Sequence, residues 1–293
     1  MNQKASSVGD LAVGLLSSSK HGMVTRVFKR SAYVKSGEDF LLLLWGDLRS
    51  PMTINVVGSA ATRVIRVDEE CELSRKGIAL KSGRIEVGGA DVFRSALLDS
   101  REVMLPGREA LRKGVAVLRS LYDVSPSGPA LNEDSALKTF ADSTLLPLAS
   151  RESAGAYSPA SFLSLVGRGG GFTPAGDDFL GGFIATFNFI ARCRSSKQIR
   201  ITRTLLRGRT VPESASVLFH SARGYVDEAM ERLVLRSLDG GEGFSDELIE
   251  VAHRGHTSGL DMSLGVLLCE AAVADADGGA GILEDCLDIL WRP

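Results

Sequence analysis

Two glycine-rich segments carry the residues best suited to bind or transform a small ligand. The first is Gly167–Gly182, with the sequence GRGGGFTPAGDDFLGG, and the second is His253–Asp261, with the sequence HRGHTSGLD. In each segment a glycine-rich loop is followed by a hydroxyl residue and then by an acid, a pattern typical of helix N-termini. The free N–H groups and the positive dipole end of a helix start favour an anion, so both segments are candidate binding sites.

The loop of the first segment is expected to supply backbone donors to a ligand. Gly169 and Gly171 permit left-handed backbone and close approach of N–H groups, and Arg168 beside them is a movable cation. We expect the following helix to start near Thr173, with the N–H groups of Ala175 and Gly176 among the donors.

Two adjacent acids, Asp177 and Asp178, lie in the first turn of that helix. The helix dipole explains one of them, but adjacent helical residues point about 100° apart, so we expect one carboxyl to face a polar cavity. It would orient an amide or amine substrate, hold Mg²⁺ through water, or act as a base. The spacing alone does not choose among these roles.

The second segment has a capping pattern and, just before it, two residues suited to chemistry. Ser258 and Asp261 fit a capping box, as do Thr210 and Glu213 at a third expected helix start. The pair His256 and Thr257 precedes the cap, where side chains project past a helix start. We expect the three helix starts to converge on one site for a small anionic or amide-bearing ligand.

Together, the two motifs resemble the family known as domain of unknown function 2877, which includes a subunit of the oxamate carbamoyltransferase of anaerobic allantoin breakdown. The likeness is expected to span most of the chain. It implies a cytoplasmic protein that takes part in carbamoyl transfer between carbamoyl phosphate and oxamate together with other subunits, and it leaves a homo-oligomer open. The residues at the matching positions, which become the site candidates, are Gly169, Gly171, Thr173, Gly176, Asp177, Asp178, His256, Thr257, Ser258 and Asp261.

On this interpretation His256, Asp178 and Asp177 are the catalytic candidates, and the remaining positions, with Arg168, bind substrate. No cofactor is required by the pattern, with Mg²⁺ as the alternative. Two other functions stay open: a noncatalytic ligand-binding or structural subunit, and a hydrolase similar to the magnesium-dependent ADP-ribosylglycohydrolases.

Composition and missing motifs exclude several function classes. The 293 residues include 34 basic and 36 acidic side chains, so we expect no nucleic-acid partner. The four Cys are far apart and form no zinc-ligand pattern, and the longest apolar run, 179–191, is too short to span a membrane. The P-loop, HExxH and GxSxG motifs are absent, which argues against P-loop ATPases, zincins and α/β-hydrolases.

The elements that must position these motifs fall into two parts, and the predicted class is α+β. Short β-branched runs between His21 and Val87 predict an antiparallel barrel or sandwich, with 63–67 among the strands and a hairpin turn at 81–84. Helical periodicity begins near Gly107. We predict an N-terminal β-rich domain over 1–124 that ends in a helix, and a multi-helix domain over 125–293.

Overall fold

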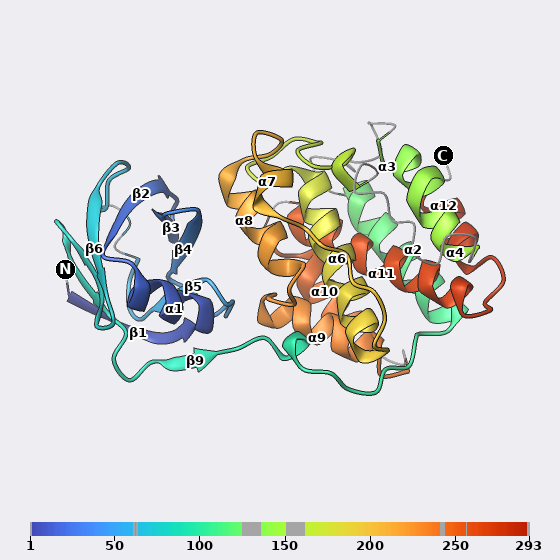
Figure 1. Cartoon of the computed structure of the whole chain (residues 1–293), viewed down its shortest axis with the longest axis horizontal. Coiled ribbons are helices and arrows are strands. Elements are labelled where there is room, and N and C mark those ends of the chain that lie inside the picture. Colours follow the sequence, from blue (N-terminus) through green and yellow to red (C-terminus); the bar gives the residue numbers. More distant parts are fainter. Residues whose placement is uncertain are drawn as a thin grey trace. The chain divides into compact units, whose positions relative to one another are not determined.

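The computed structural model describes residues 2–60, 62, 64–124, 136–150, 162–240, 244–255 and 257–291. These residues form two compact units (Figure 1). The first unit comprises Met1–Ala96 together with Tyr225–Glu228, and the second comprises Leu97–Gly224 together with Ala229–Pro293.

The first unit is a mixed β-barrel with one helix, α1 (Asp10–Ser18). Its strands run in the order β5-β4-β3-β2-β6-β7-β8-β1, and β1 also pairs with β5, which closes the barrel. The strands are β1 (Asn2–Gly9), β2 (His21–Val27), β3 (Ser31–Ser36), β4 (Asp39–Leu44), β5 (Thr53–Val56), β6 (Glu70–Ser74), β7 (Gly77–Leu80), β8 (Gly83–Glu86) and β9 (Asp91–Phe93).

The α+β class and the N-terminal barrel are confirmed, but the expected all-antiparallel pairing is wrong. Strand β1 runs parallel to β8 and β9, and β4 runs parallel to β5. Strand β1, at the start of the chain, is inserted between β5 and β8, and this insertion accounts for its own parallel pairings. Closure removes the exposed edges that an open sheet would present.

One predicted hairpin is confirmed, and one predicted strand is not formed. The hairpin of β7 and β8 is confirmed, with Leu80 opposite Gly83 and the two residues between them forming the turn. The segment 63–67 is not a strand in the residues that the structure describes: Ile65 is buried, but Val64 and Val67 are 51% and 49% exposed. Because Val64 and Val67 face solvent, the segment does not bury the alternating hydrophobic side chains that would stabilise it as a strand.

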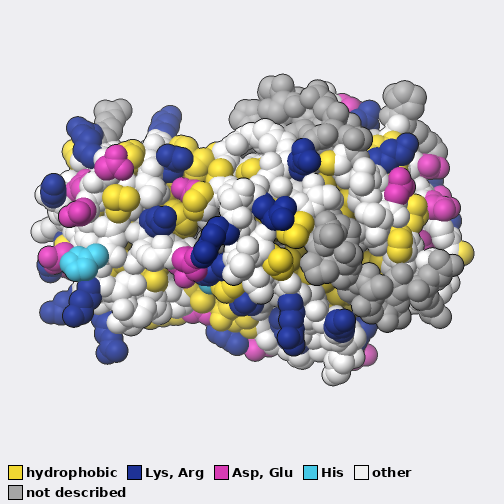
Figure 2. Space-filling view, turned by 45° about the horizontal axis from the view of Figure 1, so that its top comes forward, with side chains coloured by type: hydrophobic (Ala, Val, Ile, Leu, Met, Phe, Trp, Pro, Cys, Tyr) yellow, Lys and Arg dark blue, Asp and Glu magenta, His cyan; other side chains and the backbone are white. Residues whose placement is uncertain are grey.

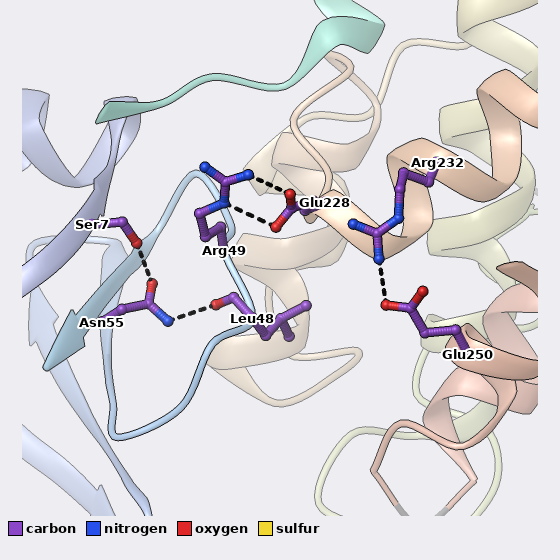
Figure 3. A network of polar contacts seen from close by, with 7 residues as sticks. All are labelled: Ser7, Leu48, Arg49, Asn55, Glu228, Arg232 and Glu250. Carbon is purple, nitrogen blue, oxygen red and sulfur yellow. Dashed lines mark hydrogen bonds and ion pairs between the residues drawn. The ribbon is translucent and has the colours of Figure 1, made fainter. Parts of the chain in front are cut away.

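A buried amide fixes one end of the barrel. Asn55 of β5 accepts a hydrogen bond from the Ser7 hydroxyl at 2.8 Å and donates to the Leu48 carbonyl at 2.9 Å (Figure 3). The neighbouring Arg49 pairs with Glu228, which belongs to the first unit although it is the first residue of helix α9 (Glu228–Ser237), whose other residues belong to the second. The loop between β4 and β5 is therefore held by polar contacts rather than by strand pairing.

The second unit is helical, and two long buried helices form its centre. Its helices are α2 (Arg108–Val124), α3 (Ala136–Phe140), the π-helical turn η2 (Ala141–Leu145), α4 (Leu146–Ala149), α6 (Ala175–Cys193), α7 (Arg203–Leu206), α8 (Pro212–Ser221), α9 (Glu228–Ser237), α10 (Ser245–Ala252), α11 (Ser258–Ala276) and α12 (Ile282–Trp291). A further ion pair, between Arg232 of α9 and Glu250 of α10, joins two of the peripheral helices (Figure 3).

Glycines let α6 and α11 cross almost backbone to backbone. A Cβ atom on Gly182 would lie 2.1 Å from the Met262 carbonyl oxygen, and one on Gly265 would lie 2.1 Å from the Phe179 carbonyl oxygen. Both contacts fall within about two turns of the helix starts. The crossing therefore holds the two helix starts near each other.

The division between the units differs from the boundary that the sequence analysis placed at 124/125. The structure divides the chain between Ala96 and Leu97, so α2 belongs to the helical unit, where it packs against α11 and α12. The apolar stripe of α2 explains this, because Leu111, Val115 and Leu118 are all fully buried.

The surface agrees with the balanced charge of the chain. On the face drawn in Figure 2, Lys and Arg side chains are interspersed with Asp and Glu on both units. Among the described residues, no helix has the length and hydropathy needed to cross a bilayer.

Candidate functional site

The two glycine-rich motifs meet at the starts of α6 and α11. The Thr173 hydroxyl oxygen lies 2.9 Å from the Ser258 hydroxyl oxygen, although the two residues are 85 positions apart. The predicted convergence of these two helix starts is confirmed. Around this contact are three buried carboxyls, those of Asp177, Asp178 and Asp261, which we call the acid cluster.

Asp178 is the carboxyl joined directly to the contact between the motifs. Its Oδ2 accepts a hydrogen bond from the Thr173 hydroxyl at 2.8 Å. Burial raises the pKa of Asp178 to about 6, although hydrogen bonds from Ser258 and Thr173 favour the ionised form. Asp178 therefore takes up or releases a proton near neutral pH.

Asp177 points to a different set of donors and brings in the third helix start. Its Oδ1 accepts from the Gly167 N–H at 2.8 Å, and its Oδ2 accepts from the Thr210 hydroxyl just before α8. Burial raises its pKa, and the bonds from Thr210, Gly167 and Ser214 oppose that rise. Both adjacent acids are thus buried, and Asp177 ties the glycine-rich loop to α8.

Asp261 is the most deeply buried member of the acid cluster. Its Oδ1 accepts from the Tyr122 hydroxyl at 2.8 Å. Its Oδ2 has no hydrogen bond of good geometry within the described part of the chain, although the Thr257 hydroxyl is near enough to lower the pKa. Burial and the charge of Asp178 raise the pKa of Asp261 to about 8, so its carboxyl is largely protonated at pH 7.

Sequence reasoning missed Tyr122, which lies in α2. It is fully buried, and burial followed by the charge of Asp261 raises its pKa well above the ordinary value. A signal was present, because Tyr122 continues the buried stripe of Leu111, Val115 and Leu118. A tyrosine at the end of such a stripe needs a buried partner for its hydroxyl.

The predicted capping boxes are wrong at both helix starts. Thr257 is the N-cap of α11 and Val211 is the N-cap of α8, and neither makes a side-chain capping bond. The residues expected to cap have other partners: Ser258 contacts Thr173, Asp261 binds Tyr122, and Thr210 binds Asp177. The hydroxyls and acids of these helix starts therefore build a polar cluster between helices.

The glycine-rich loop approaches other backbone very closely. Gly167, Gly169 and Gly171 have φ of +75°, +87° and +107°, in the left-handed region that favours glycine. A Cβ on Gly176 would lie 2.1 Å from the Leu165 carbonyl oxygen. The Gly176 N–H donates to the Arg168 carbonyl at 2.9 Å, so it is not free for a ligand as the sequence analysis expected.

The exposed part of the glycine-rich loop carries the hydrogen-bond donors that remain available to a ligand. Arg168 and the three consecutive glycines Gly169–Gly171 are exposed, and the N–H groups of these glycines make no hydrogen bond with any described residue. Thr173, Thr257 and Ser258 are half-buried between this loop and the acid cluster. His256 lies outside the described residues.

The arrangement combines neutral hydroxyls and carboxyls of raised pKa with an exposed set of backbone donors. No three His, Cys, Asp or Glu side chains within the described ranges are grouped so that they could hold a metal ion. The chemistry that these residues offer is proton transfer and hydrogen bonding to a small polar ligand.

Residues 165–270 match the family described as oxamate carbamoyltransferase subunit AllH. The resemblance based on the two motifs is confirmed over this segment, which includes the glycine-rich loop, α6, α8 and most of α11. The expected extension of the likeness over most of the chain differs from this finding, because the match covers residues 165–270, nearly all of which belong to the helical unit. No curated protein and no solved structure was found to match the chain.

Proposed function

We propose that this chain is a subunit of an oxamate carbamoyltransferase and that the starts of α6 and α11 bind its substrates. The observation that carries the proposal is the contact between Thr173 and Ser258, which joins two motifs of the family-matched segment beside buried carboxyls. Carbamoyl phosphate and oxamate are small anions that also carry N–H groups. They require donors for the anionic group and acceptors for the nitrogen.

In this proposal the anionic group of a substrate binds to the exposed loop. The N–H groups of Gly169–Gly171 and the guanidinium of Arg168 are the available donors, and positive charge at a helix start favours an anion. The acid cluster does not oppose this as three full charges would, because burial keeps Asp261 largely protonated at pH 7 and raises the pKa of Asp178.

The proton transfer that the reaction needs is assigned to Asp178. The amide nitrogen of oxamate attacks the carbamoyl carbon, a C–N bond forms, the C–O bond to phosphate breaks, and phosphate leaves with the bonding electron pair. The nitrogen must lose one proton, which an ionised Asp178 with a pKa of about 6 accepts at neutral pH. We retain His256 as a second candidate for proton transfer or for polarising the carbamoyl carbonyl.

We further propose that the protein works in the cytoplasm, in the breakdown of allantoin, with the other subunits of the transferase. The support is the description of the matched family as a subunit, which implies that one chain does not carry the whole activity. A homo-oligomer is compatible with this proposal.

The test is turnover by the reconstituted complex, with and without this chain, using carbamoyl phosphate and oxamate. We expect activity only with the chain present, and a loss of about 10²–10⁴-fold for Asp178→Ala and His256→Ala. Unchanged turnover in both variants would make the assignment wrong. Tight binding of oxamate without any effect of the variants on turnover would instead favour a noncatalytic ligand-binding subunit.

A magnesium titration tests the alternative of a magnesium-dependent hydrolase. Calorimetry with MgCl₂ on the whole chain should give no binding that Asp178→Asn abolishes. Such binding would favour the hydrolase similar to ADP-ribosylglycohydrolases, since those enzymes bind metal through acids at helix starts.

A further inference from the structure

A second exposed arginine lies beside the glycine-rich loop. It is Arg209, in the segment of residues 207–211 that joins α7 to α8, and it belongs to neither motif. The loop packs so closely against this segment that a Cβ atom on Gly167 would lie 2.0 Å from the Arg209 carbonyl oxygen. Gly169 is two residues further along the loop, at most about 7 Å from Gly167. Arg209 is therefore within side-chain reach of the loop to which the proposed function assigns anion binding.

Asp177 joins the two segments that carry Arg168 and Arg209. Its Oδ1 accepts a hydrogen bond from the N–H of Gly167, the residue before Arg168, at 2.8 Å. Its Oδ2 accepts a hydrogen bond from the hydroxyl of Thr210, the residue after Arg209. Asp177 is only 3% exposed, so these bonds are shielded from competition by water. Both oxygens of Asp177 hold the chain next to the two arginines, and Asp177 is therefore a positioning residue for them.

These two arginines, which we call the arginine pair, have no acidic partner. Arg168 and Arg209 are exposed, and neither guanidinium makes a hydrogen bond or an ion pair within the described part of the chain. In the same unit, the exposed Arg232 is paired with Glu250. Two cations held near each other repel, and an anion between them removes this repulsion. The arginine pair therefore has the charge of an anion site whose counter-charge comes from a ligand.

The donors of this site match a phosphoryl group better than a carboxylate. Each guanidinium presents a planar fork of donors, and the N–H groups of Gly169–Gly171 make no hydrogen bond with any described residue. A carboxylate has one charge and two oxygens, which a single guanidinium satisfies. A phosphoryl group has nearly two charges and three terminal oxygens at neutral pH. Of the two substrates of the proposed reaction, carbamoyl phosphate is thus the one that uses both arginines.

We propose that Arg209, together with Arg168, binds the phosphoryl group of carbamoyl phosphate. The proposal rests on the proposed function and deepens it, because it adds a binding residue outside the two motifs and names the substrate that the loop receives. Arg209 lies within residues 165–270, the segment that matches the family. Asp177 acts in this site through the two arginines rather than on the reacting atoms, so the proton transfer stays with Asp178.

The first experiment is the kinetics of the reconstituted transferase. Arg209→Gln should raise the KM for carbamoyl phosphate about 10-fold or more, as expected for loss of a charge-assisted contact, and leave the KM for oxamate unchanged. Arg209→Lys should raise it less, because it keeps the charge and loses the fork. The matched control is Arg236→Gln, which removes an exposed arginine of α9 and should change neither KM. An unchanged KM for carbamoyl phosphate in Arg209→Gln, or an equal rise for both substrates, would overturn the proposal.

The positioning role of Asp177 is tested through Thr210, which supplies one of its two hydrogen bonds. Thr210→Val removes the hydroxyl with little change of shape and should raise the KM for carbamoyl phosphate while kcat stays the same. Thr210→Ser restores the hydroxyl and should restore the KM. A loss of kcat in Thr210→Val, or a KM that Thr210→Ser does not restore, would contradict a role confined to placing the arginine pair.

The second experiment separates failure of this proposal from failure of the proposed function. Calorimetric titration of the whole chain with sodium phosphate does not depend on turnover. Phosphate should bind more tightly than oxamate, and its affinity should fall about 10-fold or more in Arg209→Gln and not in Arg236→Gln. Phosphate binding of this kind without transferase turnover would refute the proposed function and leave the arginine pair as a phosphate site. Absence of phosphate binding, or equal affinity for phosphate and oxamate, would overturn the proposal itself.

Discussion

The Tyr122 hydroxyl donates a hydrogen bond to Asp261 Oδ1 over 2.8 Å, and this bond joins α2 to the start of α11. Both side chains are fully buried, with exposed fractions of 1% and 0%. A buried carboxyl with one strong donor is held in a fixed orientation. Tyr122 is therefore a positioning residue for the acid cluster, although it lies in neither motif.

Tyr122→Phe should destabilise the protein by about 1–3 kcal/mol, because it leaves a buried carboxyl oxygen without its donor. Urea unfolding measures this change. In a double-mutant cycle with Asp261→Asn, the two effects should be non-additive, since both variants alter the same bond. Additive effects would show that the hydroxyl and the carboxyl do not interact.

The pH dependence of stability should report the protonated state of Asp261. Its pKa is raised from 3.8 to about 8, so the folded state keeps a proton that the unfolded chain loses above about pH 4. The contribution of Asp261 to stability is therefore greatest below about pH 4 and decreases as pH rises toward 8. Asp261→Asn should flatten this fall by about 1 kcal/mol or more between pH 5 and pH 8.5, measured by urea unfolding.

Glu270 provides a second test of the pH dependence of stability and, at the same time, a control for turnover. It is fully buried on the same helix, bonded to Ser237, and burial raises its pKa to about 8. Glu270→Gln should flatten the pH dependence of stability in the same direction, without affecting turnover. A loss of turnover in Glu270→Gln comparable with that in Asp178→Asn would count against a role confined to the helix starts.

Neighbouring glycines of α6 should respond differently to alanine. Gly182→Ala should cost about 1–3 kcal/mol, because its Cβ would meet the Met262 carbonyl at 2.1 Å. Gly181→Ala should be neutral or stabilising, since the nearest atom to its Cβ is the Ser221 hydroxyl at 4.0 Å. Equal thermal midpoints for the two variants would contradict the close crossing of α6 and α11.

Transferase turnover should have a pH optimum between the two raised pKa values. Below about pH 6 Asp178 is protonated and cannot accept the substrate proton, so the rate rises with pH through this range. Above about pH 8 Asp261 ionises, and its charge should weaken the binding of an anionic substrate. A rate that rises steadily to pH 9 would contradict the second effect.

Much of the fold and part of the site followed from local sequence patterns. The switch from β-branched runs to helical periodicity predicted the barrel and the helical unit, and the two motifs predicted which helix starts meet. The strand β1 was missed because its sequence, NQKASSVG, has one β-branched residue and so lacks the pattern that predicted the other strands. Tyr122 was missed because its partner, Asp261, is 139 positions away.

The capping boxes show a different limit of sequence reasoning. Ser258 and Asp261 have the spacing of a local cap, and only tertiary structure decides that they bond to Thr173 and Tyr122 instead. The same hydroxyl and carboxyl atoms serve either use. A local pattern therefore located the helix starts correctly and assigned the wrong partners to their side chains.

The most direct test of the proposed site compares Asp178→Asn with Glu270→Gln in the reconstituted transferase. Both substitutions neutralise a buried carboxyl of raised pKa in the helical unit, but only Asp178 belongs to the acid cluster. We predict that Asp178→Asn lowers turnover of carbamoyl phosphate and oxamate about 10²–10⁴-fold and that Glu270→Gln leaves it unchanged. Wild-type turnover in Asp178→Asn, with the complex intact, would contradict the central claim.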